Sequence, residues 1–405
     1  MLRVRQNPRE DEASGNFGAR ILLPILSAQM AFASISTDLY LPAMPVIGHD
    51  LSANAGSMEL TVSGFLVGFS AGQLIWGPVG DSFGRKVPVA IGIVLFCLGS
   101  AGCALSNSPF QMIGFRIVQA VGARSGIVLA RAMVRDLYKG ASAARMLSNL
   151  ITVAAIAPLL GPVVGSQIMA IAGWRAIFWV LVAVGSVTLL AITKIPETHP
   201  LQARTTESLL KSAAAYHEVI KNKRVLAYAA TGGFFLAGTY AYIAGSPFAF
   251  IKYHHLSETS YGLIFSLGIT GIILTNLVNS RLVSRYGSIA MLRVGAIIAG
   301  ASGAAVLLVD LSGFGGLPSL VIPLFCYIAG SGLVVANSVA GALEECPGRA
   351  GSVSALVGAL HYGSGMVSSS ALSYFADGTP WPMIVIVAVG GLGCAVRTFL
   401  ISPRP

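Results

Sequence analysis

The sequence consists of successive apolar runs, each long enough to cross a membrane, and this repetition limits the possible folds more than any other feature. Hydrophobic residues make up 55% of the 405 residues and charged residues only 10%, whereas an ordinary soluble domain carries about 25% charge. A helix needs about 20 residues to cross roughly 30 Å of hydrocarbon. The chain therefore has room for about twelve such spans with short connections. We expect an all-α, multi-pass membrane protein.

The limits of the apolar runs predict where each helix begins and ends. The 47 glycines favour closely packed membrane helices, because small residues let neighbouring backbones approach. The longest polar stretch divides the chain into an N-terminal tail (1–19), a six-helix bundle (20–194), a connector (195–224) and a second six-helix bundle (225–405). The predicted helices cover residues 20–46, 57–79, 87–106, 110–137, 143–172, 176–194, 225–250, 259–283, 289–312, 318–341, 350–375 and 380–401.

Lysine and arginine are distributed unevenly between the two sides of these helices. Loops on the side of the N-terminus hold 21 of the 26 basic residues, and the opposite loops hold only Arg175 and Lys252. Because basic residues accumulate in cytoplasmic loops, we expect both termini and the connector to lie in the cytoplasm. This topology accounts for the net charge of +10 without a nucleic-acid partner. The other three basic residues, Arg116, Arg124 and Arg131, lie inside the fourth predicted helix.

The two halves also resemble each other weakly. The segment DSFG (81–84) after the second predicted helix matches SRYG (284–287) after the eighth at an offset of 203 residues. Two similar six-helix bundles around a central cavity are typical of secondary transporters, which hold their substrate near the middle of the membrane.

Several motifs resemble those of a known transporter family. The loop GPVGDSFGRK (77–86) is similar to the signature of the major facilitator superfamily, and RIVQ (116–119) resembles that superfamily's second motif. The segment GPVVG (161–165) resembles the motif of its drug:proton antiporters. The segments TDLYLPAMP (37–45) and ARAMVRDLY (130–138) are similar to the bicyclomycin and chloramphenicol resistance (Bcr/CflA) exporters.

The resemblance implies a twelve-helix exporter in the bacterial inner membrane. Such a protein acts as a monomer and moves small, largely apolar drugs outward in exchange for protons by alternating access. It needs no metal or other cofactor, since the proton gradient supplies the energy. An exporter or facilitator of a physiological metabolite or sugar remains the alternative. We do not expect an enzyme, because the sequence has no catalytic constellation such as paired Asp-rich metal motifs or an HExxH helix. It also lacks a nucleotide-binding P-loop, so we do not expect ATP to supply the energy.

Proton coupling needs a titratable group that meets both the substrate cavity and water. Asp38 is the only acidic residue well inside a predicted span, and Arg116 in the fourth helix lies at about the same depth. An ion pair between them is possible if helices 1 and 4 are neighbours, as the resemblance implies. Asp38 is therefore the predicted coupling residue with Arg116 as its partner. A purely structural role remains the alternative, in which Asp38 caps a helix break before Pro42.

Residues that contact the substrate are harder to predict. An apolar pocket with a few polar groups would suit aromatic and polar side chains of several helices. Arg131 is the preferred arginine for the cavity, since Arg124 could instead reach the membrane surface or a backbone carbonyl. The candidates for the substrate cavity are Tyr40, Gln73, Arg124, Arg131, Tyr240, Tyr242 and His361.

Two further sets of residues are predicted to control the conformation. Asp81 could bind the positive N-terminal end of the eleventh helix, while Arg85 could reach Asp136. The family resemblance implies that these contacts latch the two halves together in the outward-open state; the alternative is that the basic residues only orient the loop. Gly77 and Gly84 would permit the close approach and the tight turn. In the fifth helix, prolines remove helical hydrogen bonds and glycines allow close packing. The predicted antiporter seam is Pro158, Gly161, Pro162 and Gly165.

Overall fold

A computed structural model describes residues 8–204, 216–313 and 316–401, and the elements within these residues are helices. The first half contains α1 (Pro8–Asp38), α2 (Met44–Asp50), α3 (Ala55–Phe83), α4 (Lys86–Ala104), α5 (Pro109–Leu137), α6 (Gly140–Ala154), α7 (Ile156–Ala172) and α8 (Trp174–Ile192). The second half contains α10 (Lys223–Pro247), α11 (Glu258–Tyr286), α12 (Ser288–Ser312), α13 (Gly316–Ala329), α14 (Ser331–Glu344), α15 (Ala350–Tyr374) and α16 (Trp381–Phe399).

Eleven spans in the described part of the chain are long and apolar enough to cross a membrane. α15 has 25 residues but is less apolar, with serines and glycines along much of its length. It packs along α3 and α10, so much of its surface faces protein and not lipid. Together with α15 the spans form the predicted fold of twelve helices.

Three spans that the sequence predicts as continuous helices are interrupted. The first span consists of α1, a short turn at Leu41–Ala43 and α2, because Pro42 cannot donate a hydrogen bond to the carbonyl of Asp38. Pro158 has the same effect on the carbonyl of Ala154, where α6 ends and α7 begins. The tenth span is divided between α13 and α14 at Gly330.

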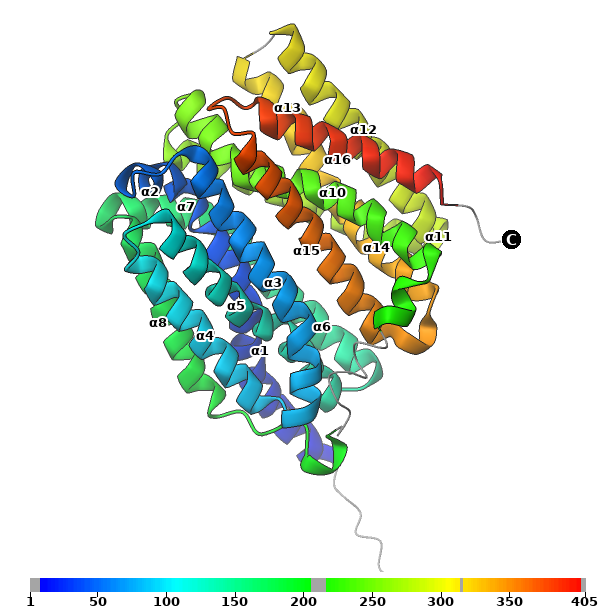
Figure 1. Ribbon diagram of the computed structural model, residues 1–405. Coiled ribbons are helices and arrows are strands. Elements are labelled where there is room, and N and C mark those ends of the chain that lie inside the picture. The colour runs from blue at the N-terminus through cyan, green and yellow to red at the C-terminus, as the bar shows by residue number, and fades with distance from the viewer. Residues whose placement is uncertain (1–7, 205–215, 314–315, 402–405) are drawn as a thin grey trace, which may run out of the picture.

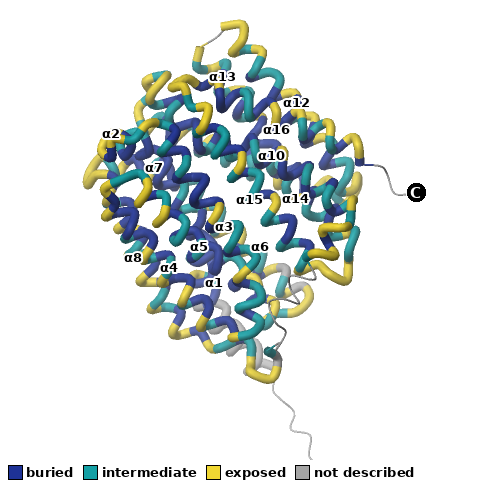
Figure 2. The backbone as a smooth tube through the Cα atoms, viewed as in Figure 1, coloured by how far each residue is buried: buried dark blue, intermediate teal, exposed yellow. Residues whose placement is uncertain are grey.

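The helices form two groups that meet along two pairs of helices. α1, α3, α4, α5 and α8 pack together in one group, while α10, α12, α14, α15 and α16 pack together in the other (Figure 1). The groups meet where α3 contacts α15 and where α7 contacts α11. Exposed residues lie along the outer helices of both groups (Figure 2). Large apolar side chains, Phe110, Ile171 and Leu308 among them, are exposed, as expected for a surface that a membrane covers.

The interface between the groups is closed by direct contacts toward one end, where a pocket of about 750 Å³ also lies between α2 and the segment 248–255, and it is open at the other end. At the closed end, Ser63 and Ser369 share a hydrogen bond of 2.7 Å, and Ser373 donates a hydrogen bond of 2.7 Å to the carbonyl of Gly56. At the other end, which we call the motif end because Asp81 and Asp136 lie there, a cavity of about 530 Å³ separates α3 and α5 from α15. The two groups therefore enclose a space that opens at the motif end.

Candidate functional site

Two neighbouring cavities lie between the groups. The central cavity, of about 230 Å³, is mainly apolar and aromatic, and the larger cavity, which we call the vestibule, is more polar. Ile127 of α5 lines both. The central cavity is lined by Ala33, Ser34, Thr37, Asp38, Val62, Phe65, Leu66, Phe69, Ile127, Pro158, Tyr240, Ile243, Phe265, Ile269 and Tyr362. The vestibule includes Gln73, Gly77, Asp81, Arg124, Arg131, Arg135, Tyr216 and Ser352.

Among the described residues that line the central cavity, Asp38 alone carries a carboxyl group. It is the last residue of α1, at the break before Pro42, and only 7% of it is exposed. Gly161 of α7 packs against it so closely that a Cβ atom there would lie 2.7 Å from the Asp38 Cβ atom, and Gly165 packs in the same way against Leu39. The glycines of the predicted seam therefore bring α7 against the break in the first span.

The seam also contacts the second group. A Cβ atom on Gly262 of α11 would lie 3.1 Å from the carbonyl of Pro162, and the Ser266 hydroxyl donates a hydrogen bond of 2.7 Å to the carbonyl of Leu159. The seam thus lies between the two groups of helices, at the place where α7 meets α11.

Arg116 does not form the expected ion pair with Asp38. Its Nη1 atom donates hydrogen bonds to the carbonyl of Ser36 at 2.8 Å and to Oε1 of Gln119 at 2.7 Å. Its guanidinium lies over the rings of Tyr40 and Phe65, 4.7 and 4.4 Å from their centroids. Arg116 therefore joins α1, α3 and α5 behind the cavity wall and acts on Asp38 only through space.

Arg124, Arg131 and Arg135, the other three arginines of α5, line the vestibule. Arg124 is 5% exposed and lies 4.2 Å from the ring centroid of Phe69 and 5.0 Å from that of Tyr362. Arg131 is exposed and lies closer to the motif end. Arg124 and Arg131 thus both line the vestibule, and Arg124 is the more deeply buried of the two. The rings of α3 and α15 hold Arg124 inside, so it does not reach the membrane surface.

Three predicted cavity residues do not line either cavity. Tyr40 is fully buried and shares a hydrogen bond of 2.6 Å with Thr61. The ring of Tyr242 is stacked on that of Phe265. His361 packs against Gly232 of α10 inside the second group. Tyr240 and Gln73, by contrast, line the central cavity and the vestibule respectively.

A second buried carboxyl group lies at the closed end, and the sequence analysis missed it. Glu59 of α3 is 4% exposed, and its Oε2 atom has no hydrogen-bond partner among the described residues. It faces a small space between the groups that Gly245, Leu372 and Met383 also line. The predicted start of the second helix at residue 57 had placed Glu59 at the membrane edge, where acidic residues are common.

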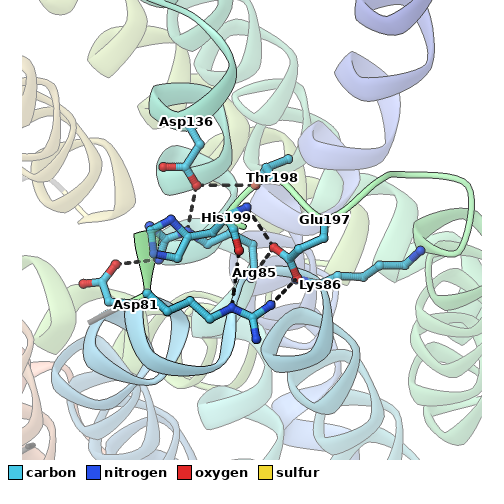
Figure 3. A network of polar contacts seen from close by, with 8 residues as sticks. Asp81, Arg85, Lys86, Asp136, Glu197, Thr198 and His199 are labelled. Atoms are coloured by element: carbon cyan, nitrogen blue, oxygen red, sulfur yellow. Dashed lines mark hydrogen bonds and ion pairs between the residues drawn. The ribbon is translucent and has the colours of Figure 1, made fainter. Parts of the chain in front are cut away.

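At the motif end, Arg85 forms two ion pairs (Figure 3). Its Nη1 atom lies 2.6 Å from Oδ1 of Asp81, and its Nε atom lies 2.9 Å from Oδ2 of Asp136. Arg85 and Asp136 are in contact as predicted, but both belong to the first group of helices and the contact is present while the motif end is open. Gly84, with a φ angle of +89°, makes the turn between α3 and α4 that presents Arg85. Asp81 faces Arg85 here and the N-terminus of α15 lies across the vestibule, so the predicted latch contact is absent from this open arrangement.

The start of the connector completes this network. The carboxylate of Glu197 accepts hydrogen bonds from the backbone N–H groups of Arg85 at 2.8 Å and Lys86 at 3.2 Å (Figure 3), and so caps the N-terminus of α4. Partial burial alone would raise the pKa of Glu197. The hydrogen bonds from Arg85, His199 and Lys86, with the charge of Arg204, nevertheless lower that pKa below its usual range. Glu197 therefore stays ionised at neutral pH and fixes the motif loop to the end of α8.

Gly77 has a different environment from Gly84. A Cβ atom on Gly77 would meet no atom within 4 Å, because the residue faces the vestibule. The present arrangement would therefore accommodate a side chain at position 77.

A family model described as Major Facilitator Superfamily matches residues 26–370. The chain belongs to the major facilitator superfamily. An uncharacterised transporter of this superfamily from Bacillus subtilis, YdgK, is 36% identical, with 84% of this chain and 86% of that protein covered. A bicyclomycin resistance protein homolog of Haemophilus influenzae is 30% identical over 90% of this chain and 91% of that protein.

A chloramphenicol resistance protein of Pseudomonas aeruginosa is 29% identical, with 95% of this chain and 94% of that protein covered. The predicted resemblance to the Bcr/CflA exporters is confirmed by these relatives. Among solved structures of this superfamily, a partially occluded inward-open form of the xylose transporter XylE from E. coli has a TM-score of 0.74 at 12% identity, over 95% of this chain and 98% of that chain. At this identity the likeness shows the major facilitator fold alone.

Proposed function

We propose that this transporter exports small, largely apolar drugs or antibiotics across the bacterial inner membrane in exchange for protons. The observation that carries the proposal is the buried carboxyl group of Asp38 on the wall of a mainly apolar cavity. Drug-resistance names among the relatives support the same direction of transport. The alternative, transport of a metabolite or sugar, has only the fold of the xylose transporter in its favour.

In this proposal the two groups of helices alternate between an inward-open and an outward-open state. The motif end, with the vestibule, faces the cytoplasm in this proposal, so the present arrangement is inward-open. The central cavity holds the substrate, Asp38 exchanges the proton, and the seam of α7 bends against the break in the first span. Asp81, Arg85 and Asp136 belong to the contact that closes the motif end. One chain contains both groups of helices, and we propose that it works as a monomer.

Transport into liposomes tests the function directly. Purified protein in liposomes with an acidic interior should accumulate labelled chloramphenicol above its external concentration, and an uncoupler should release it. The acidic interior corresponds to the outside of the cell, so accumulation requires protons to leave as the drug enters. Equal uptake with and without the pH difference would contradict proton coupling.

The proposed orientation can be tested with single cysteines on a background without the five native cysteines. Lys221→Cys lies at the motif end, in the last part of the connector before α10, and Ser257→Cys precedes α11 at the opposite end; both positions are exposed. An impermeant maleimide added to intact cells should label position 257 and leave position 221 unlabelled until the cells are broken. The reverse pattern would invert the topology.

A further inference from the structure

The guanidinium of Arg124 is the one positive charge that the described structure holds deep between the two cavities. Phe69 and Tyr362 lie against it, 4.2 and 5.0 Å from its centre. The side chain of Tyr362 already forms a hydrogen bond with this guanidinium. The Nε atom of Arg124 has no hydrogen-bond partner, and no carboxylate lies within ion-pair distance among the described residues. A buried charge is stable only when it is paired or bonded, so this guanidinium retains capacity for an acceptor that enters the cavity.

The charges around Arg124 are almost all positive. The titratable side chains that face it are Tyr362, Arg131 and Tyr240, and none of them is a carboxylate. Arg131 and Arg135 also line the vestibule, and Asp81, the one carboxylate among its described lining residues, is already paired with Arg85. Any molecule that enters from the motif end therefore passes a positively charged wall before it reaches Arg124.

Deeper in the protein, positively charged side chains again outnumber carboxyl groups among the described residues. Asp38 carries the one carboxyl group found among the described residues of the central cavity, and Arg116 lies behind its wall on the rings of Tyr40 and Phe65. Two positively charged guanidinium groups thus lie near one carboxyl group. The excess of positive charge is larger still when Asp38 is protonated and therefore neutral. A substrate cation would meet repulsion at each of these steps, whereas a carbonyl, nitro or carboxylate oxygen would find an unfilled donor.

We propose that Arg124 determines specificity: it binds an acceptor oxygen of a neutral or anionic substrate and excludes lipophilic cations from the central cavity. The proposal rests on the proposed function in so far as the substrate occupies this cavity. The aromatic walls, Phe65, Phe69, Tyr240 and Tyr362, bind the apolar body of the substrate. A substrate without positive charge also leaves Asp38 free to exchange its proton.

Equilibrium binding to the whole protein in nanodiscs tests this assignment without the membrane potential that drives cations by itself. The probes are labelled chloramphenicol, which is neutral and rich in acceptor oxygens, and labelled tetraphenylphosphonium, which is a lipophilic cation. Both are measured at one fixed pH. The proteins are the wild type, Arg124→Gln, Arg124→Lys and Arg175→Gln. Arg175 is the matched control, because its guanidinium also lies over a ring, that of Trp174 at 4.1 Å, but outside both cavities.

The wild type should bind chloramphenicol and bind tetraphenylphosphonium much more weakly. In Arg124→Gln the affinity for the cation should rise about 30-fold, the factor for removing a like charge roughly 8 Å away at an effective dielectric constant of about 20. The affinity for chloramphenicol should fall by about tenfold or more, as expected for loss of a hydrogen bond from a charged donor. Arg124→Lys should continue to exclude the cation, and Arg175→Gln should behave as the wild type.

Wild-type protein that binds the cation as tightly as chloramphenicol would overturn the proposal. Unchanged affinity for the cation in correctly folded Arg124→Gln would do the same, because it would reduce Arg124 to a packing contact between α3, α5 and α15. If binding is selective and depends on Arg124, but a pH gradient drives no transport of chloramphenicol, the result would support this specificity. It would refute only the proton-coupled export.

Discussion

Asp38→Asn should abolish the accumulation of drug against its gradient and leave exchange across the membrane intact. The substitution places an amide of nearly the same size in the same buried position, so the substrate can still bind and the helices can still move. The amide cannot take up or release a proton, and the one carboxyl group among the described residues of the central cavity is then lost. Uptake into liposomes with an acidic interior should fall to the level of empty liposomes.

The exchange of labelled for unlabelled drug in the same liposomes, without a pH difference, separates coupling from folding. It should persist in Asp38→Asn. Asp377→Asn is the matched control, since this carboxyl group is exposed in the loop between α15 and α16, and it should retain full accumulation. Accumulation driven by the pH gradient in Asp38→Asn would show that another group, with Glu59 as the nearest candidate, carries the proton.

Gly77→Leu should trap the transporter in its inward-open state. The closed end shows what closure requires of the same two helices, because Gly56 of α3 lies so close to Ser373 of α15 that even a Cβ atom would collide with the chain. At the motif end Gly77 still faces open space. A leucine there is compatible with the present arrangement but would obstruct α15 when the vestibule closes. We expect transport to fall by at least about tenfold, since a change of roughly 1.4 kcal/mol in the closing equilibrium suffices.

Spin labels on α3 and α15 at the motif end would measure the effect. Wild-type protein should show both long and short distances, and Gly77→Leu only the long ones, while binding of the drug from the motif end persists. Gly114→Leu is the control, because Gly114 of α5 also has open space around it but is exposed on the outside of the bundle. A full population of short distances in Gly77→Leu would reject the role assigned to Gly77.

The spans and the motif loop could be predicted because their causes are local. Length and hydropathy determine a membrane helix whatever its neighbours are, and the turn at Gly84 needs a glycine for its own backbone angle. Breaks in the helices were also within reach, since Pro42 and Pro158 each remove one hydrogen bond. The prediction of continuous helices was wrong at these two prolines because this local rule was not applied there.

The direction of each side chain could not be predicted in the same way. Arg116 and Arg124 are similar residues in one helix, yet Arg116 is held by Ser36 and Tyr40, and Arg124 by Phe69 and Tyr362. These partners lie up to 238 positions away in the sequence, as between Arg124 and Tyr362. The role of Glu197 could not be predicted for the same reason, because this residue caps a helix that begins 111 residues earlier in the sequence. Such choices depend on packing among helices, which hydropathy and spacing do not encode.

The limited apolarity of α15 bears on how the protein is made. A segment enters the bilayer from the insertion machinery when its own residues favour lipid over water, and the serines and glycines of α15 supply little of that preference. Its neighbours α3 and α10 are synthesised first and can offer it a protein surface in place of lipid. Membrane integration of α15 would then be a cooperative step of late assembly. Substitutions at its contacts, such as Ser369 with Ser63, would reduce the yield of inserted protein before they affect transport.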